Sequence, residues 1–263
     1  ALYDSYDPGV TTGDLQKDLK GYWKFNGDAE DRTPYSNDGT VTDASLATDR
    51  KSQSNKAYDF NSSNNRIIVS DNSAIQDIWD GGGTISLWVN ADDGGENNEG
   101  TFVAKTDGSV KGWRFYLADL SGSTIGVKLN TRFDVAQCSS INATWNTNDR
   151  VITFGQWYHI VVTYNNDSVS NDPLMYIDGQ SVTVNEGCSP TSGTRKSDDG
   201  EDLYFGTQNG LNRDFDGKMD DIRMYDRVLT AAEVASLYDS YNPGIVMNRG
   251  VMDVLGSTGS IIP

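Results

Sequence analysis

Apolar and polar residues alternate with a period of two along most of this chain, and this pattern constrains the fold more than any other feature. The alternating stretches include residues 84–90 (TISLWVN), 112–118 (GWRFYLA) and 157–164 (WYHIVVTY), and Gly, Asn or Asp bounds most of them. Because a strand turns successive side chains to opposite faces, the alternation predicts short β-strands. A single sheet of so many strands leaves its apolar face uncovered, so two packed antiparallel sheets are expected.

One helix is expected near the C-terminal end of the alternating region. Thr230 and Glu233 have the spacing of a capping box, and Leu229 is placed to pack on Val234. The apolar residues then form one helical stripe that ends at Asn-Pro-Gly, residues 242–244. The sequence therefore predicts an all-β sandwich with one short C-terminal helix.

A near-exact internal repeat sets the expected domain limits. LYDSYDPG at residues 2–9 returns as LYDSYNPG at residues 237–244, where it ends the expected helix. The first copy is interpreted as the tail of a preceding unit in a tandem array. Residues 1–19 are then an incoming linker, 20–241 the folded domain, and 242–263 an outgoing linker or docking tail. The alternative is that both copies belong to one domain and pair with each other.

The charge balance and the histidine content exclude several classes of function. Lys and Arg number 21 against 38 Asp and Glu, a formal net charge of −17 at pH 7. Such a chain repels phosphate backbones and anionic lipids, so we expect no nucleic-acid binding; with no apolar run of about 18 residues, we expect no membrane insertion by this segment. His159, the single histidine, is expected to be structural within a central strand. No strand carries the paired carboxylates of a glucanase, so no enzyme activity is expected.

The two cysteines favour an oxidising compartment. Cys138 and Cys188 each lie in a polar, loop-like segment that gives a free thiol little apolar shelter. A disulfide between them is predicted, with two reduced thiols as the alternative. The 27 Gly and 13 Tyr are typical of an extracellular β-protein.

Four segments carry a resemblance to a known family. They are the opening GYWKFNGDAEDRTPYSNDGTV, the strand TISLWVN, the strand QWYHIVVTYNN with its MYIDGQ hairpin, and the closing GKMDDIRMYDRVLTAAEVASLY. With them the chain resembles the laminin-G-like, concanavalin-A-type jelly-roll modules of bacterial surface proteins. The opening and the LYDSY repeat also resemble modules attached to pilin-like proteins. The resemblance implies a two-sheet antiparallel jelly roll over roughly residues 20–241.

The resemblance also implies a cofactor. Such modules often hold one Ca²⁺ where the first and last strands meet, a role that corresponds here to Asp31 and Asp220, with Asn37 as a further oxygen ligand. The alternative is that Asp31 caps a turn and that Asp220 or Asp221 faces solvent or pairs with Arg223.

Carbohydrate recognition in such folds combines a flat aromatic ring with amide and charged groups in a groove. Trp113, Arg114 and Trp145 are the candidates for this role, with the core as the alternative location of both indoles. The first expectation is therefore a non-catalytic, calcium-binding recognition or adhesion module at the cell surface, whose partner is a glycan or a surface protein. The second is a structural subunit of a pilus-like filament, in which terminal segments contact neighbouring copies.

Overall fold

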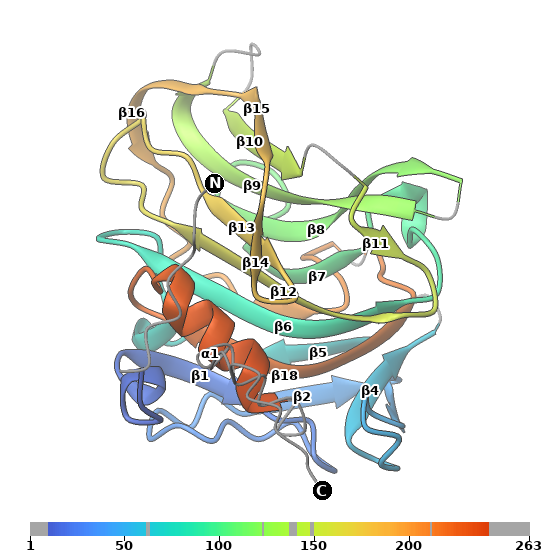
Figure 1. Cartoon of the computed structure of the whole chain (residues 1–263). Helices are drawn as coiled ribbons and strands as arrows, with labels where there is room; N and C mark the ends of the chain where they lie inside the picture. The colour runs from blue at the N-terminus through green and yellow to red at the C-terminus, as the bar shows by residue number, and fades with distance from the viewer. Residues whose placement is uncertain are drawn as a thin grey trace, which may run out of the picture.

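The computed structural model describes residues 10–61, 64–122, 124–136, 141–147, 150–210 and 212–241. Within them, two antiparallel sheets pack face to face, and one α-helix lies on the outer face of the first sheet (Figure 1). The predicted all-β sandwich with a C-terminal helix is confirmed.

The first sheet contains the strands that begin and end the domain. In chain order they are β1 (Leu19–Trp23), β3 (Ser45–Ala47), β4 (Ala57–Phe60), β6 (Gly83–Ala91), β12 (Trp157–Tyr164), β13 (Leu174–Ile177), β14 (Gln180–Val182) and β18 (Gly217–Tyr225). They pair in the order β14-β13-β12-β6-β18-β4-β3, and β1 also pairs with β18.

The second sheet contains the longest strands. They are β2 (Gly39–Thr42), β5 (Arg66–Val69), β7 (Thr101–Thr106), β8 (Gly112–Ser121), β9 (Thr124–Ala136), β10 (Asn142–Thr147), β11 (Ile152–Thr153), β15 (Val184–Cys188), β16 (Pro190–Arg195) and β17 (Leu203–Phe205). Their order is β15-β10-β9-β8-β7-β17-β5-β2, and β11 and β16 also pair with β9. Three short 3₁₀ turns, η1 (Asp14–Gln16), η2 (Ser73–Ile75) and η3 (Glu96–Asn98), lie in the connections of the described chain.

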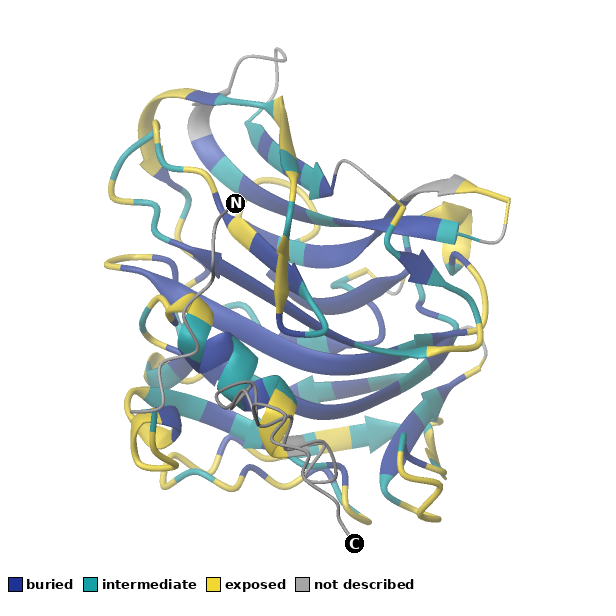
Figure 2. Ribbon diagram, viewed as in Figure 1, coloured by how far each residue is buried: buried dark blue, intermediate teal, exposed yellow. Residues whose placement is uncertain are grey.

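Alternation along the strands builds the core between the sheets. In β8, Trp113, Phe115 and Leu117 are buried in this core, whereas Arg114 lies on the opposite face. Figure 2 shows the buried residues gathered along the central strands of both sheets. One face of each sheet is therefore committed to packing and leaves the other face to be covered or solvated.

The helix α1 (Ala231–Tyr241) covers part of the outer face of the first sheet. Val234 and Leu237 pack in a second apolar cluster with Trp88 of β6. The predicted capping box is confirmed, because the Thr230 amide donates to the Glu233 carboxylate at 2.8 Å and the Glu233 amide donates to Thr230 Oγ1 at 3.2 Å. The helix start thus depends on side chains visible in the sequence.

The packed chain begins earlier than the linker boundary that the repeat suggested. Leu15, in η1, is buried in the cluster beneath the helix, and the Tyr225 hydroxyl donates to its carbonyl at 2.9 Å. Residues 14–19 of the expected incoming linker therefore pack against the domain.

Several predictions fall outside the described residues. Cys138, the first repeat copy at residues 2–9 and the tail at 242–263 lie there. The disulfide to Cys188, the tandem array and assembly through the terminal segments therefore stay predictions. Among the described residues, the helix is too short and too polar to cross a membrane.

Candidate ligand-binding cleft

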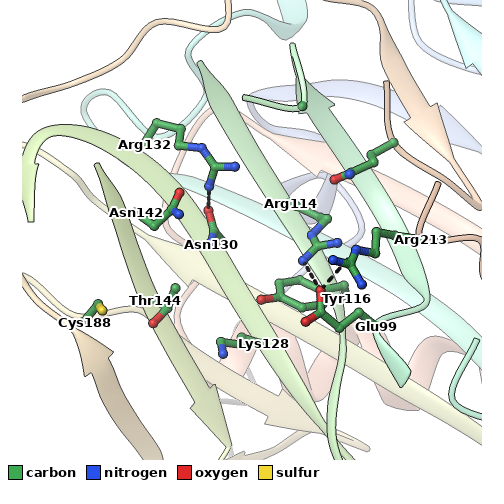
Figure 3. Close-up of a pocket in the computed structure, with 12 residues that line it drawn as sticks. Glu99, Arg114, Tyr116, Lys128, Asn130, Arg132, Asn142, Thr144, Cys188 and Arg213 are labelled. Atoms are coloured by element: carbon green, nitrogen blue, oxygen red, sulfur yellow. Dashed lines mark hydrogen bonds and ion pairs between the residues drawn. The ribbon is translucent and has the colours of Figure 1, made fainter. Parts of the chain in front are cut away.

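An open cleft of about 420 Å³ lies on the outer face of the second sheet, over β8, β9 and β10 (Figure 3). Side chains of these strands and of flanking loops line it. The lining residues are Glu99, Gly108, Arg114, Tyr116, Lys128, Asn130, Arg132, Asn142, Thr144, Cys188, Gln208 and Arg213. The lining is mostly polar, unlike the apolar pockets that bind most small molecules.

Strand register explains why these groups gather. Lys128, Asn130 and Arg132 are spaced two apart along β9, so they project from one face while Leu129 is buried in the core. Asn130 lies opposite Arg114 of β8 and Thr144 of β10. Lys128 and Arg132 also lie opposite residues of β10. Three antiparallel strands thereby place polar groups from distant parts of the sequence on one surface.

Glu99 holds one side of the cleft. Its Oε2 accepts a hydrogen bond from Arg114 Nη2 at 2.8 Å and lies 3.5 Å from Arg213 Nε, as Figure 3 shows. The Arg114 guanidinium also lies 3.6 Å from the ring centroid of Tyr116, which is 3 % exposed. The aromatic ring is thus covered by the arginine and presents no free face.

Arg132 holds the other side. Its Nε donates to the Ser109 carbonyl at 3.1 Å, and its Nη1 donates to Asn130 Oδ1. Burial and the positive charge of Arg114 lower the pKa of Arg132, and Tyr116 and Asp107 offset part of this effect. The guanidinium is therefore fixed in orientation and lies in an environment that disfavours its own charge.

Among the described residues that line the cleft, Glu99 carries the single carboxylate. Glycoside hydrolysis ordinarily uses two carboxyl groups that flank the scissile bond. The described lining of this cleft therefore lacks the usual pair.

The expected aromatic binding residues lie elsewhere. Trp113 and Trp145 are 1 % and 0 % exposed, and their Nε1 atoms donate to Asp198 at 3.0 Å and Asp172 at 2.8 Å. Neither indole offers a ring face to a ligand. The cleft therefore presents a polar surface where an aromatic platform was expected. Of the three candidates, only Arg114 lines the cleft.

Most of the cleft residues carry no motif that marks them as a site in the sequence. Lys128, Asn130, Arg132, Asn142 and Thr144 were not singled out. Alternation within residues 124–130 was a usable signal for Lys128 and Asn130, because it places them on the face opposite the apolar residues.

The predicted calcium ligand Asp31 is engaged by hydrogen-bond donors. Its Oδ1 accepts from the amides of Tyr22 and Thr33, both at 2.9 Å. Its Oδ2 accepts from the Asn37 amide at 2.9 Å and from Thr33 Oγ1 at 2.7 Å. The Asn37 side-chain amide donates to the Lys20 carbonyl at 2.9 Å. Asp31 therefore organises the loop after β1, as the turn-capping alternative proposed.

Asp220 is paired with an arginine. Arg50 donates through Nη1 to Asp220 and through Nη2 to Asp221 at 2.7 Å, and its guanidinium lies 4.6 Å from a Trp88 ring centroid. A bulge in β18 after Asp220, with φ 49° at Asp221, accompanies this shared contact. Burial and the charge of Asp221 raise the pKa of Asp220.

The contacts of Asp31 and Asp220 compete with a Ca²⁺ shell, whereas Asn37 Oδ1 is buried without a hydrogen-bond partner. The carboxylates of Asp31 and Asp220 are occupied by amides, a hydroxyl and a guanidinium, where calcium requires six to eight oxygen ligands. The described part of the chain holds no group of three or more His, Cys, Asp or Glu residues that could hold a metal. Calcium binding stays a prediction that this geometry does not support.

His159 lies in β12 with no solvent exposure. Its Nε2 is 2.8 Å from Ser86 Oγ, its ring centroid is 5.3 Å from that of Trp88, and burial lowers its pKa to about 3. A neutral, buried imidazole that contacts a neighbouring strand is a structural residue, as expected.

Comparison with known proteins places the fold. The family model described as the concanavalin A-like lectin/glucanases superfamily matches residues 61–235. Paraclostridial mosquitocidal protein 1 of Paraclostridium bifermentans is 25 % identical over 189 residues, which are 68 % of this chain and 14 % of that protein. This chain therefore spans a small part of that relative.

Solved structures give the same result. The binding domain of Paraclostridial mosquitocidal protein 1 has a TM-score of 0.65 at 21 % identity, over 86 % of this chain and 53 % of that one. The botulinum neurotoxin serotype D ligand-binding domain, solved with N-acetylneuraminic acid, has a TM-score of 0.60 at 14 % identity, over 85 % and 51 %. The chain spans about half the length of these domains, and such identities show the fold alone. The chain belongs to the concanavalin A-like lectin/glucanases superfamily.

Proposed function

We propose that this domain is a non-catalytic carbohydrate-binding module and that the cleft over β8, β9 and β10 is its binding face. The observation that carries the proposal is the row of hydrogen-bonding side chains from three paired strands, including Asn130, Asn142 and Thr144. Sugars present many hydroxyl groups that both donate and accept, and such a surface is complementary to them. The single carboxylate in the cleft supports binding without hydrolysis.

Two further parts of the proposal concern the location of the module at a cell surface and the kind of protein that contains it. Its solved relatives include toxin binding domains, one of them with N-acetylneuraminic acid, and this supports recognition of glycans or receptors at a cell surface. The LYDSY repeat supports a place in a tandem, extracellular adhesion protein. Sequencing of the gene on both sides of this segment tests the tandem arrangement.

A glycan array tests the proposal directly. Wild-type protein is expected to bind a defined group of glycans, and Thr144→Trp, which fills the cleft, is expected to abolish that binding. Thr40→Trp is the matched control, because Thr40 is an exposed strand residue at the far edge of the same sheet. Equal binding by wild type and a folded Thr144→Trp variant would move the binding face elsewhere, and absence of any glycan binding would reject the function.

A further inference from the structure

We infer that the cleft selects carbohydrates that carry a negative charge, and that Lys128 and Arg132 contact the acidic groups of an oligosaccharide lying along β9. This inference rests on the proposed carbohydrate-binding function and names its ligand class.

The charge of the cleft is opposite to that of the chain. The protein has a formal net charge of −17, yet Arg114, Lys128, Arg132 and Arg213 line one cleft, and Glu99 is the one acidic residue in the part of the lining that the structure describes. A local cluster of one sign focuses the electrostatic field and attracts ligands of the other sign. An acidic chain that gathers cations on one face thus has a site for an anion.

The arginines and the lysine are not equivalent. Glu99 forms ion pairs with both Arg114 and Arg213 and offsets one of their two positive charges, whereas the ion pairs found among the described residues include none for Lys128 or Arg132. Asp107, the acidic residue that acts on Arg132, already accepts the amides of Ser109, Val110 and Lys111 through Oδ1. Lys128 and Arg132 are therefore the cations available to a ligand.

Arg132 is pre-organised for this role. Hydrogen bonds to the Ser109 carbonyl and to Asn130 fix its guanidinium through Nε and Nη1. A bound anion would relieve the repulsion from Arg114 that now disfavours the charge of Arg132. Because little side-chain freedom remains to be lost, the binding energy of the anion is not spent on ordering the arginine.

Strand spacing sets the size of the ligand. Lys128 and Arg132 are four residues apart on one face of β9, a separation of about 13 Å along the strand. Asn130 lies between them, and Asn142 and Thr144 flank it on β10. An oligosaccharide along β9 can therefore place acidic groups on the cations and hydroxyl groups on the amides.

The absence of an aromatic platform in the cleft points the same way. Neutral sugars are commonly held by stacking on an exposed ring. Tyr116, the aromatic residue of the cleft lining, is covered by Arg114. Because no ring is available for stacking in the described lining of this cleft, affinity for a sugar must come from charge and hydrogen bonding.

Three probes with one disaccharide core test the inference by calorimetry: 3′-sialyllactose, 3′-sulfolactose and lactose. We expect the acidic sugars to bind at least about tenfold more tightly than lactose, because hydrogen bonds to charged groups are the stronger ones. Preference for the sialylated or the sulfated probe identifies the acidic group as carboxylate or sulfate. A higher salt concentration should weaken binding of the acidic sugars and leave the affinity for lactose unchanged.

Substitutions in the cleft identify which cations contact the acidic group of the sugar. Each probe carries one acidic group, so at least one of Lys128→Gln and Arg132→Gln should weaken binding of the acidic sugar about tenfold or more, according to which cation that group contacts. Glu99→Gln should strengthen it about threefold, because a competing negative charge is removed. Lys218→Gln is the control, a partly exposed lysine of β18 in the other sheet that pairs with Asp92 at 3.5 Å.

The outcomes separate this inference from the proposed function. Equal affinity for lactose and the acidic sugars would overturn the inference and leave carbohydrate binding intact. Binding to phosphatidylserine vesicles without binding to any sugar would overturn both. Unchanged affinity in folded Lys128→Gln and Arg132→Gln proteins would also overturn the inference.

Discussion

The most specific stability prediction concerns Lys105. Its side chain has no solvent exposure, and its Nζ donates to Asp71 Oδ1 at 2.6 Å, to the Asp198 carbonyl at 3.1 Å and to the Glu201 carbonyl. The substitution Lys105→Met keeps most of the side-chain volume and removes the charge with all three hydrogen bonds. Asp71 and two carbonyls then lose their donor in a largely dry site.

The size of the effect follows from these contacts. Removal of one partner of a buried ion pair costs about 3–5 kcal/mol, because the other charge stays buried without compensation. Asp71 is 23 % exposed and can regain some water, which favours the lower end of that range. The two carbonyls add to the loss, so we expect the free energy of unfolding to fall by about 4 kcal/mol.

Urea unfolding followed by tryptophan fluorescence measures this change. The midpoint should fall by about 2 M at an m value near 2 kcal/mol/M. The second substitution Asp71→Asn should restore part of the loss, because it removes the stranded charge. The control Lys218→Met, at a partly exposed pair, should change stability by less than about 0.5 kcal/mol. A loss below about 1 kcal/mol in Lys105→Met, with an unchanged m value, would refute the reasoning.

Three other predictions follow from the described contacts. Burial lowers the pKa of His159 to about 3 from 6.5, so the unfolded chain takes up a proton first as the pH falls below 6.5. Stability is then lost on acidification from pH 6.5 toward 3, and at pH 5 this costs about 2 kcal/mol. Urea titrations at pH 7 and 5 should show this extra loss in wild type and not in His159→Gln; an equal pH response would contradict it. The substitution Thr230→Ala should cost about 1 kcal/mol by removing the cap of α1, measured by thermal unfolding, and an unchanged melting temperature would contradict the role of the capping box. Calcium binding through Asp31 and Asp220 requires EDTA to lower the melting temperature; an unchanged melting temperature would reject it, and this is the result that the occupied carboxylates favour.

The sequence predicted the strands that pack on both sides better than those at the edges. The segment 157–164 is β12 with the expected limits, because its apolar residues follow the alternation of a buried sheet. The strands β2, β3, β10, β11, β15 and β16 were not expected. Their residues are mostly polar or exposed, and pairing with a neighbouring strand holds them in place.

The Asp178-Gly179 turn was predictable for a local reason. The sequence places this dipeptide between two alternating segments, and both residues have positive φ, 50° and 76°. A two-residue type I′ hairpin requires this conformation, and Asp and Gly adopt it at low cost. The hairpin β13–β14 forms around it with Ile177 opposite Gln180.

The candidate site could be predicted only in part. Arg114 lines the cleft and its role in ligand binding stays a prediction, whereas Trp113 and Trp145 are buried. A sequence does not say which face of a strand is buried. Alternation separates the two faces and leaves their assignment open. The second sheet packs its Trp113 face on the core, and this leaves Arg114 outside.

Short strands, the start of the helix and a large negative charge can all be predicted from the sequence, because each of these depends on neighbouring residues or on composition. Which strands are neighbours, and in what register, follows from the fold of the whole chain. This register places Arg114, Asn130 and Thr144 in one row, and the fold also pairs Asp220 with Arg50. Contacts between residues far apart in sequence depend on how the whole chain packs.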